Sequence, residues 1–265
     1  MTAISVIMGV YNSNQGSMLE ESIQSILTQT FKDFEFIICD DGSTDGTWSK
    51  LMELKSVDKR LKVIRNEKNQ GLAATLNHCL QNVNAQYIAR MDADDISLPN
   101  RFEKQFEFLN THQDYAFVGS SVILFDEKGD WGFRKNPEKP EKKHLLFDSP
   151  FTHPSIMIRT DILKKVGGYR VGEETRRCED YDLFMRLYAK GYKGYNLQEP
   201  VIKFRENKDA YSRRKYKFRI DEAKVRYNGF RQLGLMPKGI PYIIKPLIVG
   251  LIPQTVLSKL RREKI

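Results

Sequence analysis

The amino-acid sequence predicts an α/β fold built on a mainly parallel sheet. Up to about residue 125, short apolar runs alternate with segments of helical periodicity, and polar clusters directly follow three of the runs. Near-continuous apolar runs are typical of parallel strands that helices cover on both faces. The chain has 265 residues and is 40% hydrophobic, so it can bury one large core, with a small appendage at most.

Five apolar runs are predicted as buried strands, and the first of them reads ISVIMGV. These strands are expected at Ile4–Val10, Phe34–Cys39, Leu61–Ile64, Tyr87–Met91 and Ala116–Leu124. Helical spacing predicts helices between them, at Ser22–Thr28, Thr47–Leu54, Leu72–Val83 and after Pro99. This alternation of strands and helices predicts right-handed crossovers.

The second half of the chain is less regular. Asp126–Pro140 is charged and contains Gly and Pro, which predicts a loop or a hairpin. A short strand is expected at Ile156–Ile158 and a turn at Val166–Tyr169. A helix is expected from about Glu179, with an apolar stripe at Leu183, Phe184 and Leu187.

Positive charge is concentrated at the carboxyl-terminal end. Residues 203–265 hold 17 Lys and Arg against 5 Asp and Glu, a net +12, whereas residues 1–202 carry −3. Arg213–Leu233 is predicted to be a helix with Tyr216, Ile220, Ala223, Tyr227 and Phe230 on one face. Ile240–Leu257 is apolar, but its length and the prolines at 241, 246 and 253 argue against a membrane-spanning helix.

The charge asymmetry predicts two parts, a globular domain at 1–205 and a basic helical extension at 206–265 that binds an anionic membrane surface. The alternative is that the apolar segment packs on this domain or on a second subunit. Cys39, Cys79 and Cys178 are widely spaced, which favours a reducing compartment over a disulfide framework or a zinc site. No secretory signal is recognised after Met1, so we expect a cytoplasmic protein, peripheral on the inner face of the membrane.

Two short acidic clusters carry the most specific chemical signal. Asp92, Asp94 and Asp95 follow the fourth predicted strand, and Glu179 and Asp180 open a predicted helix. Crowded carboxylates repel one another, and Mg²⁺ or Mn²⁺ would offset that repulsion while binding the phosphate oxygens of a substrate. The alternatives are a solvated turn that caps the next helix, for the first cluster, and an acidic first turn that favours the helix dipole, for the second.

Polar residues follow three of the predicted strands. Tyr11-Asn12 follows the first, Asp40–Ser43 the second and the Asp92 cluster the fourth. In open α/β sheets, ligands bind beyond the carboxyl ends of the strands. We therefore expect the three clusters to form one ligand site.

Four segments taken together resemble the inverting glycosyltransferases of family 2, namely Ser5–Asn12, Asp40–Thr47, Met91–Asp95 and Glu179–Leu183. The resemblance covers residues 3–205 and implies the GT-A fold, a Rossmann-like nucleotide-binding sheet with an acceptor-side α/β half. It also implies a hexosyltransferase (EC 2.4) with a UDP-sugar donor and a Mn²⁺ or Mg²⁺ cofactor. The tail is similar to that of members that build bacterial capsule, O-antigen or exopolysaccharide, which implies a saccharide acceptor linked to polyprenyl diphosphate.

The resemblance implies a donor-binding role for four residues outside the acidic clusters. Asp41 would accept a hydrogen bond from the uracil imide, and the backbone around Gly9 and Tyr11 would form the floor of the base-binding site. His153, in its HPS segment, resembles a donor-side position of relatives. The alternatives are a helix-capping turn for Asp40 and Asp41, and a structural role for His153.

Roles for the acidic residues follow from the same resemblance. Asp94 would bind the metal, and Asp92 would contact the ribose hydroxyls or support the metal site. Asp95 is expected to cap the helix behind Pro99. Asp180 would be the base that deprotonates the acceptor hydroxyl, with Glu179 as the alternate.

One departure concerns the end of the last core strand. Many relatives have a Tyr-Arg-x-His element there, whereas this chain reads Phe204-Arg205-Glu206-Asn207, so that histidine ligand is absent or replaced.

Two other functions compete with sugar transfer. A metal-dependent nucleotidyltransferase should carry a basic loop after the first strand, and Tyr11–Gln15 has no basic residue. A nucleic-acid-binding protein that uses the tail needs stacking aromatics on an exposed surface, whereas Tyr216 and Phe218 fall in an amphipathic helix. Neither the sugar, nor the acceptor, nor the oligomeric state can be predicted from the sequence.

Overall fold

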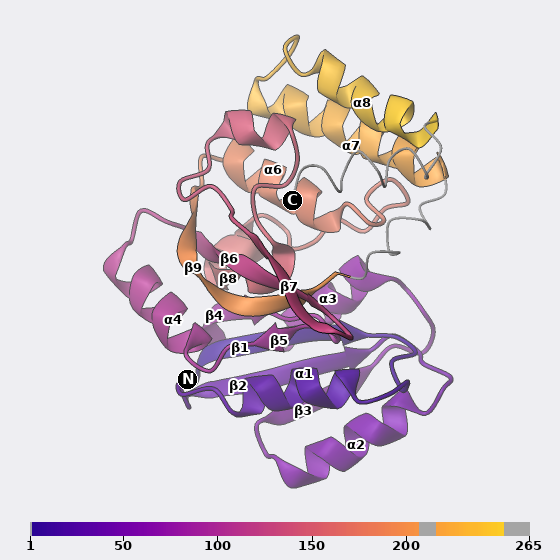
Figure 1. Ribbon diagram of the computed structural model, residues 1–265, viewed down its shortest axis with the longest axis vertical. Coiled ribbons are helices and arrows are strands. Elements are labelled where there is room, and N and C mark those ends of the chain that lie inside the picture. The colour runs from indigo at the N-terminus through magenta and orange to yellow at the C-terminus, as the bar shows by residue number, and fades with distance from the viewer. Residues whose placement is uncertain (1, 207–215, 252–265) are drawn as a thin grey trace.

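The computed structural model describes residues 2–206 and 216–251, which form one nine-stranded mixed sheet with helices on both faces (Figure 1). Its strands are β1 Thr2–Val10, β2 Phe34–Asp40, β3 Leu61–Arg65, β4 Ala85–Arg90, β5 Ile96–Ser97, β6 Phe117–Asp126, β7 Gly129–Arg134, β8 Met157–Arg159 and β9 Gly194–Arg205. Its helices are α1 Met18–Leu27, α2 Thr47–Val57, α3 Leu72–Gln81, α4 Arg101–Thr111, α5 Thr160–Lys165, α6 Glu179–Ala189, α7 Tyr216–Leu233 and α8 Ile240–Leu251, with 3-10 turns η1 Lys142–Leu146 and η2 His153–Ser155. The sheet order is β3-β2-β1-β4-β8-β6-β9-β5, and β7 pairs with β6.

Strands β3, β2, β1 and β4 pair in parallel, as the apolar runs predict, and β6 and β9 form a second parallel pair. Val10 at the end of β1 is in register with Asp40 at the end of β2. Ile7 of β1 is in register with Arg90 at the end of β4. The carboxyl ends of these strands therefore meet at one edge of the sheet, where the polar clusters begin.

Two apolar cores lie on opposite faces of the sheet. On one face, Ile4, Val6 and Met8 of β1 belong to a cluster with buried residues of α1, α2 and α4. On the other face, Ile7 belongs to a cluster with residues of α3, α5, α6 and α7. Figure 1 shows α6, α7 and α8 together in the upper half of the view and α1 and α2 in the lower half.

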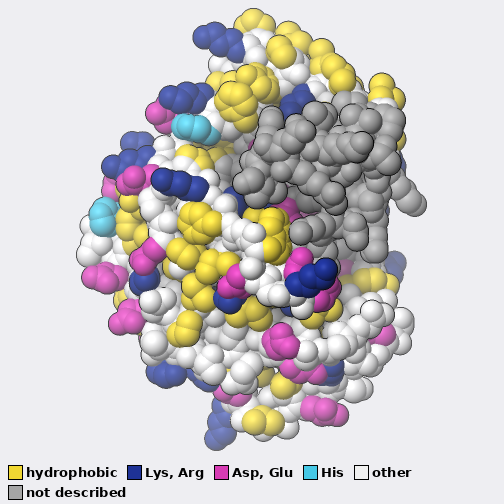
Figure 2. Space-filling view, in the orientation of Figure 1, with side chains coloured by type: hydrophobic (Ala, Val, Ile, Leu, Met, Phe, Trp, Pro, Cys, Tyr) yellow, Lys and Arg dark blue, Asp and Glu magenta, His cyan; other side chains and the backbone are white. Residues whose placement is uncertain are grey.

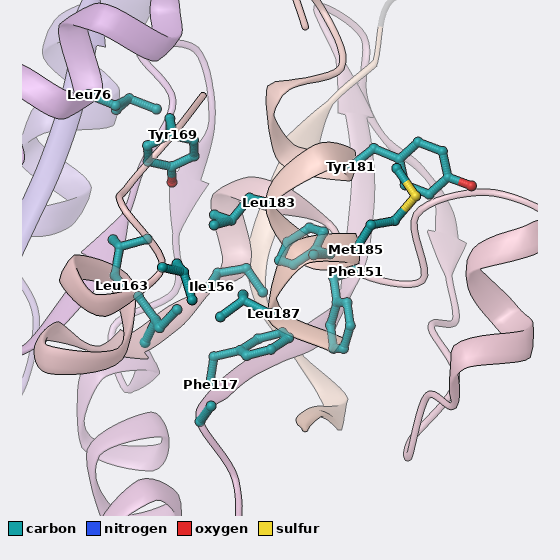
Figure 3. Packing of buried hydrophobic residues seen from close by; sticks show 14 of the residues in the cluster. Leu76, Phe117, Phe151, Ile156, Leu163, Tyr169, Tyr181, Leu183, Met185 and Leu187 are labelled. Atoms are coloured by element: carbon teal, nitrogen blue, oxygen red, sulfur yellow. The ribbon is translucent and has the colours of Figure 1, made fainter. Parts of the chain in front are cut away.

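Helix α6 is fixed by the apolar stripe predicted for it. Leu183, Phe184 and Leu187 are buried in the second cluster. Figure 3 shows Leu183 and Leu187 extending from α6 toward Ile156 and Phe117. This packing holds the first turn of α6, and with it Glu179 and Asp180, at a fixed place relative to the sheet.

Strands β5, β7, β8 and β9 were predicted only in part. Asp126–Pro140 contains β7, so the hairpin is the correct alternative at 129–134. Strand β8, Met157–Arg159, confirms the short strand expected at 156–158 to within one residue, whereas β5 has two residues, which is too few to show a periodicity. Strand β9 contains Pro200 and pairs with β6 through two irregularities of register, so its apolar residues follow no regular alternation.

Helix α7 confirms the predicted tail helix over its described residues, but of the predicted apolar face only Ala223 and Phe230 are buried. Tyr216, Ile220 and Tyr227 are 42%, 41% and 45% exposed. The face turned to the protein also includes Arg226 and Gly229, which an apolar pattern does not reveal. A Cβ at Gly229 would lie 2.1 Å from Met185 Sδ, so α7 packs closely on α6 because that side chain is missing.

Helix α8 runs through Pro246, so this proline does not break it, and Pro253 lies outside the described residues. Tyr242 and Ile243 pack against the second core, while Ile244 and Ile248 are exposed. Among the described helices, none combines the length and the apolar character that crossing a membrane requires. Because α7 contributes Val225 and Phe230 to the same core, the tail begins as part of the globular body.

Candidate active site

The polar residues after β1 and β2 form one bonded surface. Asn12 N–H donates to Ser43 Oγ at 2.9 Å, and Thr44 N–H donates to Asn12 Oδ1 at 2.9 Å. Met91, which leads into the acidic cluster, donates its N–H to the carbonyl of Ile7. The structure thus brings the predicted clusters together at one edge.

Asp41 is buried and has several partners. Its Oδ1 accepts from Gln70 N–H at 2.9 Å and from Asn66 Nδ2 at 2.8 Å. Its Oδ2 accepts from Gly71 N–H at 2.8 Å, immediately before α3. Asp41 therefore holds the turn that leads into α3, which supports the structural alternative, while its donor-binding role stays a prediction.

The neighbouring Asp40 also has partners within its own loop and on β3. Its Oδ1 accepts from Ser43 N–H at 3.1 Å, and Arg65 Nε lies 3.0 Å from its Oδ2. These contacts shape the DDGS turn, so Asp40 supports the loop on which Asp41 stands.

Gly9 and Tyr11 differ in what surrounds them. A Cβ at Gly9 would lie 3.0 Å from Thr75 Cγ2 and 3.2 Å from Leu72 Cδ1, so the missing side chain lets α3 approach β1. Tyr11 follows β1 and is 48% exposed, which leaves its ring available to a ligand. The predicted floor for a nucleobase stays a prediction at both residues.

The Asp92 cluster fits a divalent cation. Ligand oxygens of Asp92, Asp94 and Asp95 all lie within 4.8 Å of one another. Partial desolvation and the Asp92 carboxylate raise the pKa of Asp94 to about 6. Because Asp94 keeps an exposed side, a cation could reach the cluster and relieve the repulsion.

Asp95 does not cap α4, which corrects that expectation. The residue before α4 is Asn100, and Asp95 Oδ1 accepts instead from Arg205 N–H at 2.7 Å. Asp95 is 1% exposed and its Oδ2 has no partner. Burial raises the pKa of Asp95 well above its usual value, and the charges of Asp92 and Asp94 add to this effect.

The end of β9 contacts the acidic loop at the place where many relatives have the Tyr-Arg-x-His element. Arg205 Nε donates to the Asp94 carbonyl at 2.9 Å, in addition to the bond from Arg205 N–H to Asp95. Glu206 pairs with Arg134, and Asn207 lies outside the described residues. Arg205 therefore fixes the backbone of the acidic loop from the neighbouring strand.

Arg90 is the site residue that the sequence reasoning missed. It is 4% exposed and forms an ion pair with Asp92 through Nη2. The nearby charges of Asp92 and Asp95 raise its pKa despite its burial. The available signal was a cation on the same face of β4 as Ile88, inside a run that otherwise predicts core.

His153 lies in η2 and is buried. Its Nε2 is 2.9 Å from the hydroxyl of Tyr169, which comes from the predicted Gly-Gly-Tyr turn. Burial, with a smaller effect from Arg90, holds the pKa of His153 well below its usual value, so the imidazole is neutral. This arrangement supports a structural role for His153, and contact with a donor stays a prediction.

Glu179 and Asp180 form the first turn of α6. Burial and the Asp180 carboxylate raise the pKa of Glu179 to about 7. Burial also raises the pKa of Asp180. At neutral pH the pair can hold one proton between two carboxylates, which leaves one of them free to act as a base.

The comparisons with known proteins agree with this geometry. The family model described as Glycosyl transferase family 2 matches residues 5–167. The chain is 43% identical to the glycosyltransferase EpsE of Bacillus subtilis (strain 168), over 99% of this chain and 94% of EpsE. It is 32% identical to an Escherichia coli UDP-Gal:alpha-D-GlcNAc-diphosphoundecaprenol beta-1,3-galactosyltransferase, over 86% of this chain and 83% of that protein.

Solved structures share the fold. The S. aureus protein TarS (1-349) in complex with UDP-GlcNAc matches with a TM-score of 0.71 and 18% identity, over 92% of this chain and 73% of that one. The mannosyltransferase PcManGT from Pyrobaculum calidifontis, in complex with GDP-Man and Mn²⁺, matches with a TM-score of 0.62 and 17% identity, over 94% and 68%. The predicted GT-A fold is confirmed.

The raised pKa of Glu179 predicts a pH-dependent cost to stability. Between about pH 4.5 and 7 the folded state keeps a proton that the unfolded state has lost, so the free energy of unfolding falls as pH rises through this window. Glu179→Gln should therefore raise the free energy of unfolding by roughly 1–3 kcal/mol at pH 8 and change it little at pH 4. Denaturant unfolding at both pH values measures this difference.

Glu67→Gln is the matched control, because Glu67 is exposed. It should leave the pH dependence of the parent unchanged. A Glu179→Gln variant that is no more stable than the parent at pH 8 would contradict the buried, crowded carboxyl described above.

Proposed function

The chain belongs to glycosyltransferase family 2, and from this premise we propose that it transfers a hexose, with inversion, from a UDP-sugar to a hydroxyl of a lipid-linked saccharide in the synthesis of a bacterial surface polysaccharide. The observation that carries the proposal is the meeting of two acidic groups, one at the end of β4 and one at the start of α6, around the buried cation Arg90. The printed activity of the Escherichia coli relative supports both the UDP-sugar and the diphosphoundecaprenol-linked acceptor.

A nucleoside diphosphate would be bound along the carboxyl ends of β1, β2 and β4. A carboxylate has about four lone-pair positions, and three protein donors already use Asp41. One position on Oδ2 is left, which suits the single imide N–H of uracil. Tyr11 and the backbone at Gly9 would lie against the base, and His153 would lie on the sugar side.

Asp94 and Asp92 would hold Mn²⁺ or Mg²⁺, which as a Lewis acid would offset the negative charge of the departing diphosphate. The protein contributes the geometry around these two residues. Arg90 fixes Asp92, and Arg205 holds the loop backbone at Asp94 and Asp95.

Asp180 would take the proton of the acceptor hydroxyl as that oxygen attacks the anomeric carbon from the face opposite UDP. The bond between the anomeric carbon and the diphosphate breaks in the same displacement, which inverts the configuration. Burial strengthens Asp180 as a base, because it raises the pKa of this carboxyl. Glu179 can hold the shared proton and position the acceptor.

The two competing functions have less support. For nucleotidyl transfer, the chain lacks a basic loop after β1, and that reaction would give the α6 carboxylates no catalytic role. Nucleic-acid binding would need free cations along the tail, yet Arg226 of α7 is buried against Glu222, and Arg219 pairs with the same residue.

We also propose that α8 binds an anionic membrane surface, which would place the enzyme on the inner face of the cell membrane. Its exposed apolar residues share one helical face, at Ile240, Ile244, Ile248 and Leu251. Figure 2 shows hydrophobic side chains gathered at the top of the view, where α8 lies in Figure 1. Lys238 and Lys245 stand beside this face, and basic residues next to an apolar stripe favour anionic headgroups.

Sugar transfer is tested by screening UDP-sugars for hydrolysis and for transfer to a lipid-linked acceptor. Asp180→Asn should still bind UDP while transfer falls by about 10²-fold or more, the usual contribution of a positioned base. If Asp180→Asn keeps its activity and Glu179→Gln loses it, the base is Glu179. If the parent turns over no UDP-sugar, the proposed function is wrong.

The metal assignment is tested by thermal unfolding with UDP. Mn²⁺ should raise the Tm of the parent in the presence of UDP and raise that of Asp94→Asn far less, because an amide loses the charge that attracts the cation. Asp114→Asn is the control, since Asp114 is an exposed residue after α4. Equal stabilisation of the parent and Asp94→Asn would remove Asp94 from the metal site.

Membrane binding is tested by sedimentation with anionic vesicles. The parent should pellet with them, more weakly at high salt but not to zero, because the apolar contact is insensitive to screening. The double variant Ile244→Glu, Ile248→Glu should stay in solution and still bind UDP. Val57→Glu, at an 85% exposed residue of α2, should pellet like the parent. A parent that never pellets, or a double variant that still does, would assign this face to another contact.

A further inference from the structure

Two buried arginines lie side by side in the structure and differ in how their donors are used. Arg101 is fully buried, and its guanidinium donates to Gln105 Oε1 at 3.0 Å and to the Arg90 carbonyl at 2.8 Å. A third nitrogen, Nη1, lies 3.5 Å from Met91 Sδ. Every nitrogen of this guanidinium has a partner, so Arg101 is a structural residue that joins α4 to the end of β4.

Arg90 has the opposite pattern. Its Nη2 is paired with Asp92, but its Nε and Nη1 are buried and have no partner among residues 2–206 and 216–251. Burying a cation with unpaired N–H groups is unfavourable, and a purely structural arginine would use those donors as Arg101 does. The position of the charge, rather than hydrogen bonding to the fold, is therefore what Arg90 supplies.

The Arg90 charge acts on both acidic groups of the site. Arg90 ends β4, two residues before Asp92. Its charge also acts on Glu179 and Asp180 at the start of α6, and on Tyr169 and His153 beneath them. It is thus a fixed positive charge that acts on the donor side and the base side at once.

We propose that Arg90 is a positioning residue for sugar transfer, which holds Asp92 in place and keeps the carboxylates of β4 and α6 close enough together for donor and acceptor to meet. The inference rests on the proposed function. Without this cation, like charges would push the first turn of α6 and the acidic loop apart, and the diphosphate of a donor would add to the repulsion. A misplacement of about 1 Å between reacting groups can cost 10²-fold in rate.

Arg90→Met removes the charge and keeps a side chain of similar length. We expect kcat for transfer to fall by about 10²-fold and the affinity for UDP with Mn²⁺ to fall by less, because among the donor-side residues only Asp92 loses its partner, while Asp41 and Asp94 keep theirs. The Tm should fall as well, because Asp92 loses its ion-pair partner, so kcat is measured on the folded protein. Arg90→Lys keeps the charge and should recover at least tenfold of the lost rate.

Arg101→Lys is the matched control at a second buried arginine. It should lower the Tm, because the contacts to Gln105 and to the Arg90 carbonyl are lost, while kcat of the folded protein changes by only a few-fold.

Three outcomes would overturn the inference. The first is an Arg90→Met variant with the kcat of the parent, and the second is one whose Tm falls as that of Arg101→Lys does while kcat of the folded fraction is retained. Should Arg90→Met not fold, Arg90→Gln, which also removes the charge, decides by the same two measurements. The third outcome, a parent without transfer activity, would overturn the proposed function as well, so the two failures are distinguishable.

Discussion

Repulsion among five carboxylates is the constraint on which the site depends. Three of them follow β4, with ligand oxygens within 4.8 Å of one another, and two begin α6, which packs on the sheet. Burial raises the pKa values of Asp94 and Glu179, and within each group the neighbouring carboxylate, Asp92 or Asp180, adds to this effect. Arg90 and Arg205 of β9 offset part of this repulsion inside the protein, and one side of Asp94 stays exposed to solvent.

The sequence predicted those parts of the fold that local patterns encode. The parallel strands β1, β2 and β4 bury most of both faces, so each reads as an apolar run, and the stripe of α6 has a clear helical period. Strand β9 was missed because its pairing depends on register irregularities with β6, which lies far away in sequence. The buried face of α7 was predicted only in part because Gly229 and Arg226 make its contacts through an absent side chain and a paired charge.

The sequence predicted where the polar residues after the strands lie, but not their partners. Asp41 and the Asp92 cluster lie at the expected edge of the sheet because strand ends can be read from the sequence. What each side chain contacts depends on distant segments: Gln70 and Gly71 for Asp41, and Arg205 for Asp95. Arg90 went unrecognised for a similar reason. The effect of its charge on Glu179 becomes apparent only when the position of α6 in the fold is known.

The close contact of Gly229 with Met185 has a consequence for acceptor choice. Helix α7 packs on α6, which carries Glu179 and Asp180, and α8 packs on α7. The reaction centre and the exposed isoleucines of α8 are therefore joined by rigid packing rather than by a loose tether. In the proposed membrane-bound state, the catalytic base Asp180 would lie at a fixed distance from the lipid surface. A fixed distance between the catalytic base and the bilayer would favour saccharides whose reacting hydroxyl projects that far from the membrane over shorter or longer ones.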